Sequence, residues 1–323
     1  MIINVGTDSG KSFTKAMMQL PNGEFVKTIF PTSFEETDTK AAPDGCFEVV
    51  YNDVRYIVGE ANRKCSREKE GRTKEKLIHK VCTLTAICDV IKKAKLQGAK
   101  ISDVKTVNIT VNMPLSEYLD KNLRQSAISF YNSGKNTSII VDNVTYSFVI
   151  NVLPYYEGLG AVLKEADTYK NQRVISIDFG SLNTGYVTLD GLKIVSTNDN
   201  DAGTIDFGCS RLLTSVNKLF KDNQVKGITT EAQVLEVLAG NNSFVKNEIV
   251  ELGREKVLDY VGQIYDALFD LEVGVDSTKI LASGGATKLY EEHFNKVFKM
   301  KNVVVSKENS EFANAEGSLK LLA

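Results

Sequence analysis

The chain has 323 residues, of which 42% are hydrophobic and 25% are charged, and its formal net charge is −2. These values fit a soluble globular protein of about two domains. They exclude a general electrostatic field for polyanions, so any contact with nucleic acid would be local or pass through a partner. No run of about 18 apolar residues indicates a membrane-spanning helix. We therefore expect a cytoplasmic protein with no membrane association.

The chain has few cysteine and histidine residues. The five cysteines form no CxxC pair and are odd in number, which indicates reduced thiols that mostly pack. His79 and His293 fall in separate helical segments, so neither a His/Cys metal site nor a His-dependent triad is expected. His79 lies beside an apolar helical stripe and is interpreted as a surface or boundary residue. The cysteines are Cys46, Cys65, Cys82, Cys88 and Cys209.

A glycine-rich turn near the N-terminus connects two predicted strands. Residues 1–5 are apolar and β-branched, residues 13–20 form a second strand, and Pro21-Asn22-Gly23 turns into a third over residues 25–30. Backbone N–H groups of the turn can form an anion-binding nest, and Lys15 can reach back to a phosphate. Asp8 would repel a bare phosphate, so its presence suggests a hydrated metal cation between the two.

Two other interpretations of this turn have to be weighed. Residues 6–12 nearly spell the P-loop GxxxxGK[ST], but three residues instead of four separate Gly6 from Gly10-Lys11, and a strand follows where a P-loop opens into a helix. The P-loop is therefore disfavoured. On this segment alone, an ordinary hairpin turn with no ligand remains equally acceptable.

The next 120 residues alternate hairpins and helices. We expect a loop over residues 31–46, a solvated charged stretch over 59–72, and strands that end at Pro154. The predicted elements are strands 47–51 and 54–58, a helix from Leu77 to Ile91, a strand 104–111, a helix 116–130, and strands 137–141, 144–149 and 149–153.

A strand-to-helix junction follows Pro154. Gly158 and Gly160 supply half of a GxGxxG fingerprint, but position 163 is Leu, so a dinucleotide-binding site is not supported. The junction instead presents Glu157 at the start of a helix. A purely structural acid, favoured there by the helix dipole, is the competing interpretation.

The N-terminal pattern recurs half a chain later. Residues 174–177 form a buried strand, Asp178-Phe179-Gly180 turns, and residues 186–189 form the next strand. This match to Asp8-Ser9-Gly10 indicates an internal duplication. Two such loops facing each other would clamp the phosphates of a nucleotide, with a metal between Asp8 and Asp178.

The remainder is mostly helical. One helical stripe is expected to face the core, namely Val245, Ile249, Leu252, Val257, Val261, Ile264 and Leu268. The predicted elements are a strand 192–196, helices 206–220, 230–239, 243–271 and 289–298, strands 279–282 and 303–305, and a terminal helix opened by residues 312–317.

These motifs resemble those of the actin-like ATPases, over nearly the whole chain and in the same order. Asp8, Gly10 and Lys15 fit the family's first phosphate motif, D-x-G-x-x-x-x-K. Asp178, Gly180 and Thr184 fit the second phosphate motif, and Gly284-Gly285 fits the adenosine-side turn. Residues 314–317 resemble the second connecting helix, and Glu157 takes the place of the family's water-orienting residue.

The resemblance implies an α/β actin-like fold of two similar domains, each a mixed sheet flanked by helices, with the nucleotide in the interdomain cleft. The first domain would be residues 1–165 plus 308–323 and the second 166–307. The implied catalytic residues are Glu157, Asp178 and Asp8, and the two aspartates would hold Mg²⁺ through water. The implied nucleotide contacts are Ser9, Gly10, Lys11, Ser12, Lys15, Gly180, Ser181, Asn183, Thr184, Gly203, Gly284 and Gly285.

Within that superfamily the compact length and Glu157 resemble the plasmid-segregation actins of the ParM type. The resemblance implies a filament of head-to-tail subunits driven by ATP hydrolysis, and a DNA-binding adaptor protein in place of direct specific DNA binding. GTP instead of ATP stays open, as does the role of Lys11, where relatives usually carry a small polar residue. The alternative is a small-molecule kinase, or another non-polymerising ATPase, using the same clamp.

Overall fold

The computed structural model describes most of the chain, and its contacts divide the chain into two compact units. Unit 1 comprises Met1–Lys164 and Asn314–Ala323, and unit 2 comprises Glu165–Ala313. The charged stretch after Gly59 and Cys65 lie outside the described residues. Those described are 1–38, 41–59, 76–132, 134, 136–195, 200–228, 231–241, 244–285, 287–298, 303–306 and 310–323.

Unit 1 is built on a mixed sheet, which has nine strands among the described residues, in the order β3-β2-β1-β7-β9-β8-β5-β6-β4. Parallel pairing joins β1 to β7 and β7 to β9, and antiparallel pairing joins the rest. The strands are β1 (Ile2–Ser9), β2 (Phe13–Gln19), β3 (Phe25–Pro31), β4 (Phe34–Glu36), β5 (Phe47–Tyr51), β6 (Val54–Val58), β7 (Thr106–Met113), β8 (Thr137–Val141) and β9 (Val144–Tyr156).

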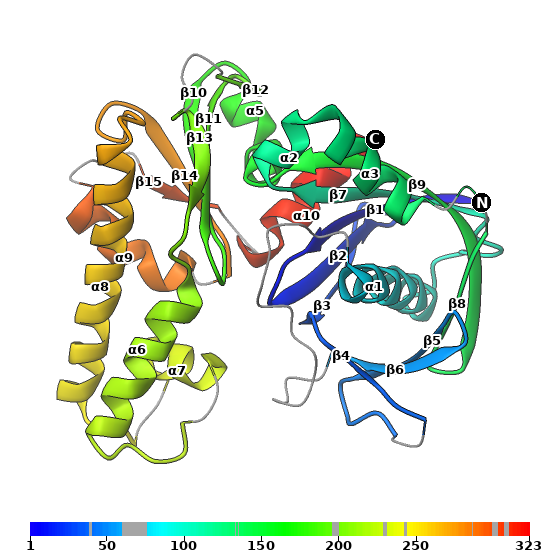
Figure 1. Ribbon diagram of the computed structural model, residues 1–323, viewed down its shortest axis with the longest axis horizontal. Helices are drawn as coiled ribbons and strands as arrows, with labels where there is room; N and C mark the ends of the chain where they lie inside the picture. The colour runs from blue at the N-terminus through cyan, green and yellow to red at the C-terminus, as the bar shows by residue number, and fades with distance from the viewer. Residues whose placement is uncertain are drawn as a thin grey trace. The chain divides into compact units, whose positions relative to one another are not determined.

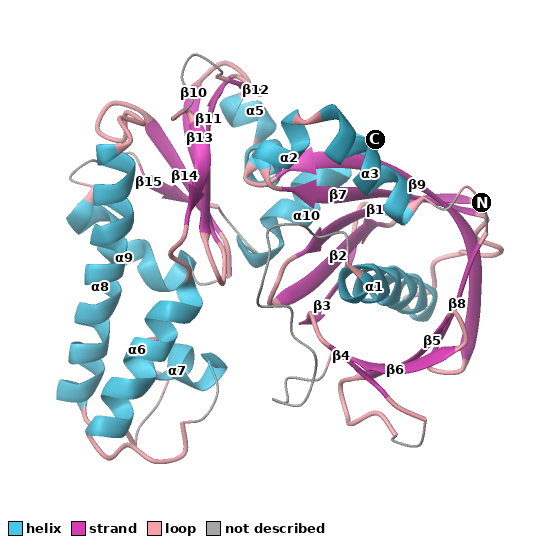
Figure 2. Cartoon of the chain, viewed as in Figure 1, coloured by secondary structure: helices cyan, strands magenta, loops and turns pink. Residues whose placement is uncertain are grey.

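The sheet of unit 1 curls around one helix, α1 (Leu77–Leu96), as Figures 1 and 2 show. Apolar and small residues occur on every side of α1, and such a helix is stable only when it is buried all round. Its side chains share one core with β1, β2, β5, β7 and β8. The remaining helices of this part are α2 (Leu115–Leu119), α3 (Lys121–Tyr131) and α4 (Leu159–Lys164).

Two expectations for unit 1 are wrong in detail. Part of the predicted loop 31–46 is strand β4, which pairs with β6 in spite of its polar sequence. Strand β9 also continues through Pro154 instead of ending there. Proline is tolerated because β8 pairs with β9 only up to Phe148, so one edge of the strand has no ladder at Pro154.

Unit 2 repeats the central strand order of unit 1. Its described sheet runs β12-β11-β10-β14-β15, and β13 pairs with β11. Both β3-β2-β1-β7-β9 and β12-β11-β10-β14-β15 join their strands by two antiparallel and then two parallel pairings. The strands are β10 (Arg173–Phe179), β11 (Thr184–Asp190), β12 (Lys193–Ile194), β13 (Ala202–Ile205), β14 (Lys279–Ser283) and β15 (Val303–Val305). The internal duplication predicted from the two Asp-x-Gly turns is thus confirmed at the level of topology.

The helices of unit 2 that follow residue 208, α6 to α9, pack with β10 and β14 into a second core. Sequence patterning missed β13 and placed the start of α6 three residues too early. In α8, Val250 and Gly253 are buried where Leu252 was expected, and Leu252 is 42% exposed. The helices are α5 (Ala166–Tyr169), α6 (Cys209–Asp222), α7 (Glu231–Leu238), α8 (Asn247–Asp270) and α9 (Thr287–Val297).

The C-terminal residues return to unit 1. In unit 2, η1 (Ser310–Phe312) leads into α10 (Ala313–Leu319), and from Asn314 on α10 and η2 (Lys320–Leu322) belong to unit 1. Helix α10 lies against α4 so closely that a Cβ added to Gly317 would be 1.6 Å from the carbonyl oxygen of Gly160. A Cβ on Gly6 of β1 would likewise be 2.0 Å from the carbonyl oxygen of Ala315. None of the described helices is long and apolar enough to cross a membrane.

Candidate functional site

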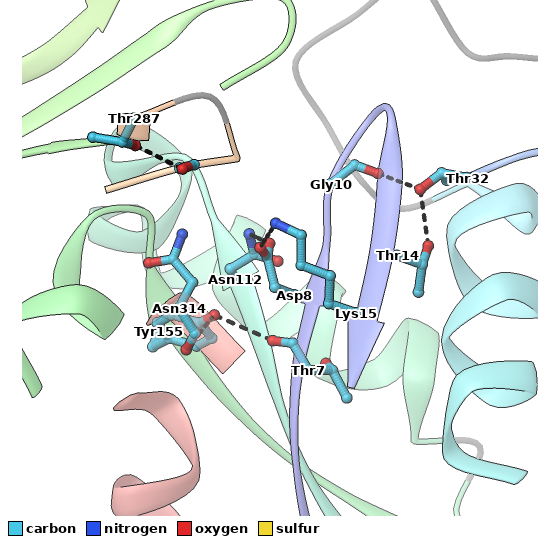
Figure 3. A network of polar contacts seen from close by, with 11 residues as sticks. Thr7, Asp8, Gly10, Thr14, Lys15, Thr32, Asn112, Tyr155, Thr287 and Asn314 are labelled. Carbon is cyan, nitrogen blue, oxygen red and sulfur yellow. Dashed lines mark hydrogen bonds and ion pairs between the residues drawn. The ribbon is translucent and has the colours of Figure 1, made fainter. Parts of the chain in front are cut away.

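The carboxylate of Asp8 is the centre of a polar cluster at the end of β1 (Figure 3). Antiparallel register places Lys15 directly opposite on β2, and its Nζ lies 3.1 Å from Oδ2 of Asp8. Asn112, at the end of the parallel neighbour β7, donates from Nδ2 to Oδ1 of Asp8 at 2.8 Å. The side chains of Lys15 and Asp8 are 13% and 7% exposed, so this ion pair is largely desolvated. Sequence analysis predicted Asp8 and Lys15 but missed Asn112.

The turn after Asp8 is held by backbone and threonine contacts. Gly10 donates its N–H to the carbonyl of Phe13, and a Cβ at Gly10 would be 2.8 Å from that oxygen. Thr32, at the end of β3, donates its hydroxyl to the Gly10 carbonyl at 2.6 Å and its N–H to the Ser12 carbonyl. The turn therefore requires glycine, and Thr32 fixes it from a neighbouring strand.

Ser9 has a partner that the sequence did not indicate. Its Oγ lies 2.9 Å from Nδ1 of His79, in the first turn of α1, and both side chains are buried. The interpretation of His79 as a surface or boundary residue is therefore wrong. His79 is drawn into the core with the buried apolar residues around it on α1. Ser9, expected to contact the nucleotide, has its hydroxyl directed at this helix.

The second Asp-x-Gly turn is built like the first. Asp178 lies in β10, opposite Gly185 on β11, and the Gly180 turn precedes Thr184. A Cβ on Gly180 would be 2.7 Å from the Asn183 carbonyl, at the same three-residue offset as Gly10 and Phe13. Thr184, an expected phosphate ligand, is buried and donates its hydroxyl to the Phe207 carbonyl at 2.8 Å. Its geometry favours a role in anchoring the turn.

The first turn of α6 contacts the Gly180 turn and holds it in place through hydrogen bonds. Cys209 and Ser210 donate their N–H groups to the carbonyls of Gly180 and Ser181, and the Ser181 and Ser210 hydroxyl oxygens lie 2.5 Å apart. A Cβ on Gly208 would be 2.3 Å from the Ser181 carbonyl. Gly208 and Ser210 were not predicted, since only the folded chain brings α6 to the turn.

The Gly284-Gly285 turn lies beside this hairpin. Parallel register pairs Asp178 with Ser283, so the carboxyl end of β14 adjoins that of β10. Gly284 has φ +118° and approaches the Phe179 carbonyl so closely that an added Cβ would be 2.5 Å away. Thr287 donates its hydroxyl to the Gly284 carbonyl at 2.6 Å. Gly203 is instead in β13, covered by the ring of Tyr186.

Glu157 follows β9 at a sharp turn. Its N–H donates to the Met113 carbonyl at 2.8 Å, and Gly158 has φ +85°, which L side chains rarely adopt. Helix α4 then begins at Leu159. The predicted junction is thus present, and the Glu157 side chain is half-buried beside the end of β7.

The donor sets fit a hard cation held mainly through water. In unit 1, Asp8 and Asn112 offer oxygen atoms, which Mg²⁺ prefers, and in unit 2 Asp178 does so. Mg²⁺ usually keeps several of its waters when it binds beside phosphates. No group of three or more His, Cys, Asp or Glu side chains suited to a metal occurs among the described residues. An all-protein cage is therefore not found in that part of the chain.

The fold and these turns define a class of protein. Residues 6–160 match the family model of actin-like proteins, N-terminal domain. This part of the chain is similar to that family of domains, and the chain as a whole has the actin-like fold. The resemblance drawn from the motifs is confirmed.

Solved structures similar to this one cover nearly its full length. The archaeal actin homologue Ta0583 shares 17% identity at TM-score 0.74, covering 99% of both chains, and its complex with ADP is also similar. The apo psk41 ParM protein shares 14% identity at TM-score 0.71, covering 99% of this chain and 96% of that one. An AlfA filament bound to AMPPNP shares 17% identity at TM-score 0.61, with the same coverage. No curated protein sequence matches the chain.

Proposed function

We propose that this chain is a nucleotide-dependent, filament-forming ATPase of the ParM type. The observation that supports this best is the repeated hairpin, in which a central parallel strand ends in Asp8 or Asp178 and turns on a glycine. Each unit thereby offers one carboxylate and a set of turn N–H groups to a nucleotide. Among the similar structures, one is a complex with ADP and one is a filament with AMPPNP.

Each residue of the proposed site has one task. Lys15 carries three N–H donors and uses one on Asp8, so the others can contact phosphate oxygens. Asp8 and Asp178 hold water of a bound Mg²⁺, which would neutralise phosphate charge. Glu157 orients or activates the attacking water. Gly284 lets its turn approach the Phe179 carbonyl, which places the turn beside the Asp178 hairpin.

Assembly in the absence of any other substrate tests the proposal against the kinase alternative. Sedimentable polymer should form with Mg-ATP or a non-hydrolysable analogue and much less with ADP, because a nucleotide favours assembly only by binding the assembling conformation more tightly. The same assay with Mg-GTP decides the base preference. A strictly monomeric protein at tens of micromolar with both triphosphates would contradict the filament.

Two isosteric variants test the metal carboxylates. Asp8→Asn and Asp178→Asn keep the side-chain shape, whereas Asp8→Ala would also leave Lys15 without its partner. Both should weaken Mg-ATP binding or hydrolysis, and Asp167→Ala, on the 99% exposed side chain of Asp167, should not. Wild-type hydrolysis by both asparagine variants would rule out this assignment.

Glu157→Ala separates binding from chemistry. It removes the water-orienting carboxylate and no phosphate contact, and such assistance is worth about 10²–10⁴ in rate. The variant should assemble with ATP and then persist, because hydrolysis is the proposed release step. Normal turnover of its filaments would exclude this role, and Glu24→Ala, in an exposed turn, serves as the control.

The proposed cargo is plasmid DNA, reached through an adaptor protein. The argument rests on the ParM-type resemblance, and the net charge of −2 is compatible with it. Purified chain should show no sequence-specific DNA binding at physiological salt. Tight specific binding by the chain alone would overturn the adaptor.

A further inference from the structure

Asn112 is the least explained residue of the Asp8 cluster. It is the second-last residue of β7, the parallel neighbour of β1, and is 2% exposed. Its amide nitrogen and the ammonium of Lys15 converge on the two oxygens of Asp8, at 2.8 and 3.1 Å (Figure 3). Both oxygens of that carboxylate therefore have one donor each from the protein.

Chemistry fixes which way the Asn112 amide faces. An ionised carboxylate only accepts hydrogen bonds, so the NH₂ group must face Asp8 and the carbonyl oxygen Oδ1 must face away from it. Oδ1 is buried and has no hydrogen-bond partner among the described residues. A buried amide oxygen in a native protein is nearly always paired, so an unpaired one marks a place that a ligand or water completes.

A second asparagine on the same strand shows the contrast. Asn108 lies four residues earlier on the same face of β7, donates to Oδ1 of Asn4 at 2.8 Å, and accepts from Nδ2 of Asn151 at 2.9 Å. Its amide is used at both ends by neighbouring strands. Of these four asparagines, Asn112, beside the predicted metal carboxylate, is the one whose buried acceptor has no partner among the described residues.

We propose that Asn112 is a positioning residue of the nucleotide site, an inference that rests on the proposed function. Its NH₂ group fixes the rotation of the Asp8 carboxylate. Its Oδ1 accepts a hydrogen bond from a water molecule bound to the divalent cation that enters with the nucleotide. Asp8 and Asn112 then present adjacent acceptors to a hydrated cation, which suits Mg²⁺ because it gives up its water reluctantly.

Nucleotide affinity with and without metal tests this role. A fluorescent ATP analogue is titrated into wild type, Asn112→Ala and the control Asn108→Ala, in Mg²⁺ and in EDTA. Wild type and the control should bind more tightly in Mg²⁺. For Asn112→Ala the ratio of the affinity in Mg²⁺ to that in EDTA should be about 5- to 30-fold smaller than for wild type. This is the size expected for the loss of one hydrogen bond to a polarised partner. An equal loss in Mg²⁺ and in EDTA would show a merely structural role and overturn the inference.

Asn112→Asp provides a second variant of the same shape. It places a second carboxylate within hydrogen-bonding distance of Asp8, and like charges so close destabilise each other unless a cation joins them. Millimolar Mg²⁺ or Ca²⁺, without nucleotide, should raise the melting temperature of Asn112→Asp and leave that of wild type nearly unchanged. No difference between the two would count against a cation-facing Oδ1.

The outcomes separate the two proposals. Wild-type protein whose ATP affinity is the same in Mg²⁺ and in EDTA, or absent in both, would contradict the proposed function itself. A normal Mg²⁺ advantage in wild type that Asn112→Ala retains in full would remove only the role of Asn112.

Discussion

Two donors from different strands compensate the desolvation of the Asp8 carboxylate. Lys15 faces it across an antiparallel pair and Asn112 reaches it from a parallel neighbour. Asp8 and Lys15 are seven residues apart in the sequence, and the hairpin of β1 and β2 places them opposite each other. The same spacing that fits the proposed phosphate motif therefore also creates the ion pair.

Removing the ammonium group of Lys15 from this ion pair should lower the free energy of unfolding. Lys15→Met leaves Asp8 buried with one neutral donor, and breaking a buried ion pair on one side typically costs about 3–5 kcal/mol. We expect a loss near the lower end, about 3 kcal/mol, in urea unfolding without nucleotide. Lys105→Met is the matched control, because Lys105 and its partner Asp103 are 74% and 77% exposed. It should change stability by less than about 0.5 kcal/mol, and similar losses for both variants would contradict this account.

Sequence spacing predicted the residues that local chain geometry brings together. Asp8, Gly10 and Lys15 belong to one hairpin, as do Asp178 and Gly180, so their relation follows from turn and strand periodicity. The residues that support them come from elsewhere in the chain. Asn112, Thr32, His79 and Gly208 reach the two turns only through strand pairing and helix packing, which one sequence does not mark.

At the scale of elements, glycines decide how closely α4, α10 and β1 approach. Gly160 and Gly317 bring two helices together without intervening side chains, and Gly6 lets β1 contact α10. Ser318 adds a hydroxyl contact to Thr110 of β7 at 2.8 Å. Lys164 pairs with Glu316 at 3.3 Å, with both side chains largely buried. The C-terminal helix is therefore an integral part of unit 1.

Alanine at position 317 should destabilise this crossing. Its Cβ would be 1.6 Å from the Gly160 carbonyl oxygen, so a backbone must shift, and overpacking of this kind costs about 1–3 kcal/mol. Gly262→Ala, within α8, is the control because nothing lies within 4 Å of its added Cβ. It should gain up to about 1 kcal/mol from helix propensity. The melting temperature should therefore fall for Gly317→Ala and rise for Gly262→Ala. Shifts in the same direction would exclude close packing as the cause.

Periodicity located most strands and helices but not their least typical members. The short strands β4 and β13 carry polar residues or glycine and exist because β6 and β11 supply an open edge. The start of the α8 stripe was misplaced by one position, because Gly253, which looks like a neutral residue, is buried against Leu238. The remainder of the stripe, from Val257 to Leu268, was predicted correctly. Tertiary pairing decided each of these cases.

At the scale of the whole molecule, buried weak acids make stability depend on alkaline pH. Burial raises the pKa of the Cys209 thiol to about 11 and that of the Cys82 thiol to about 12. Desolvation also raises the pKa of the phenols of Tyr260 and Tyr290, whose rings pack beside Cys209. In the folded chain these groups remain protonated well above pH 9.

The free energy of unfolding should therefore fall as pH rises. Above the ordinary thiol value of 9.0 the unfolded chain releases protons that the folded chain retains, up to about pH 11 for Cys209. Each such group contributes a slope of about 1.4 kcal/mol per pH unit. Urea unfolding from pH 7 to 11 measures the slope, and Cys209→Ala should make it shallower. A stability that is constant or rises above pH 9 would refute the prediction.

The path of the chain through its two units has a consequence for synthesis. The chain leaves unit 1 after Lys164 and returns at Asn314, so a ribosome completes unit 2 before it makes the helix that packs on Gly6 and Gly160. Nascent domains generally fold in the order in which they emerge. Here unit 1 begins to emerge first but is completed second, because its C-terminal segment follows unit 2. Until α10 emerges, the nascent unit 1 exposes the surface that this helix later covers.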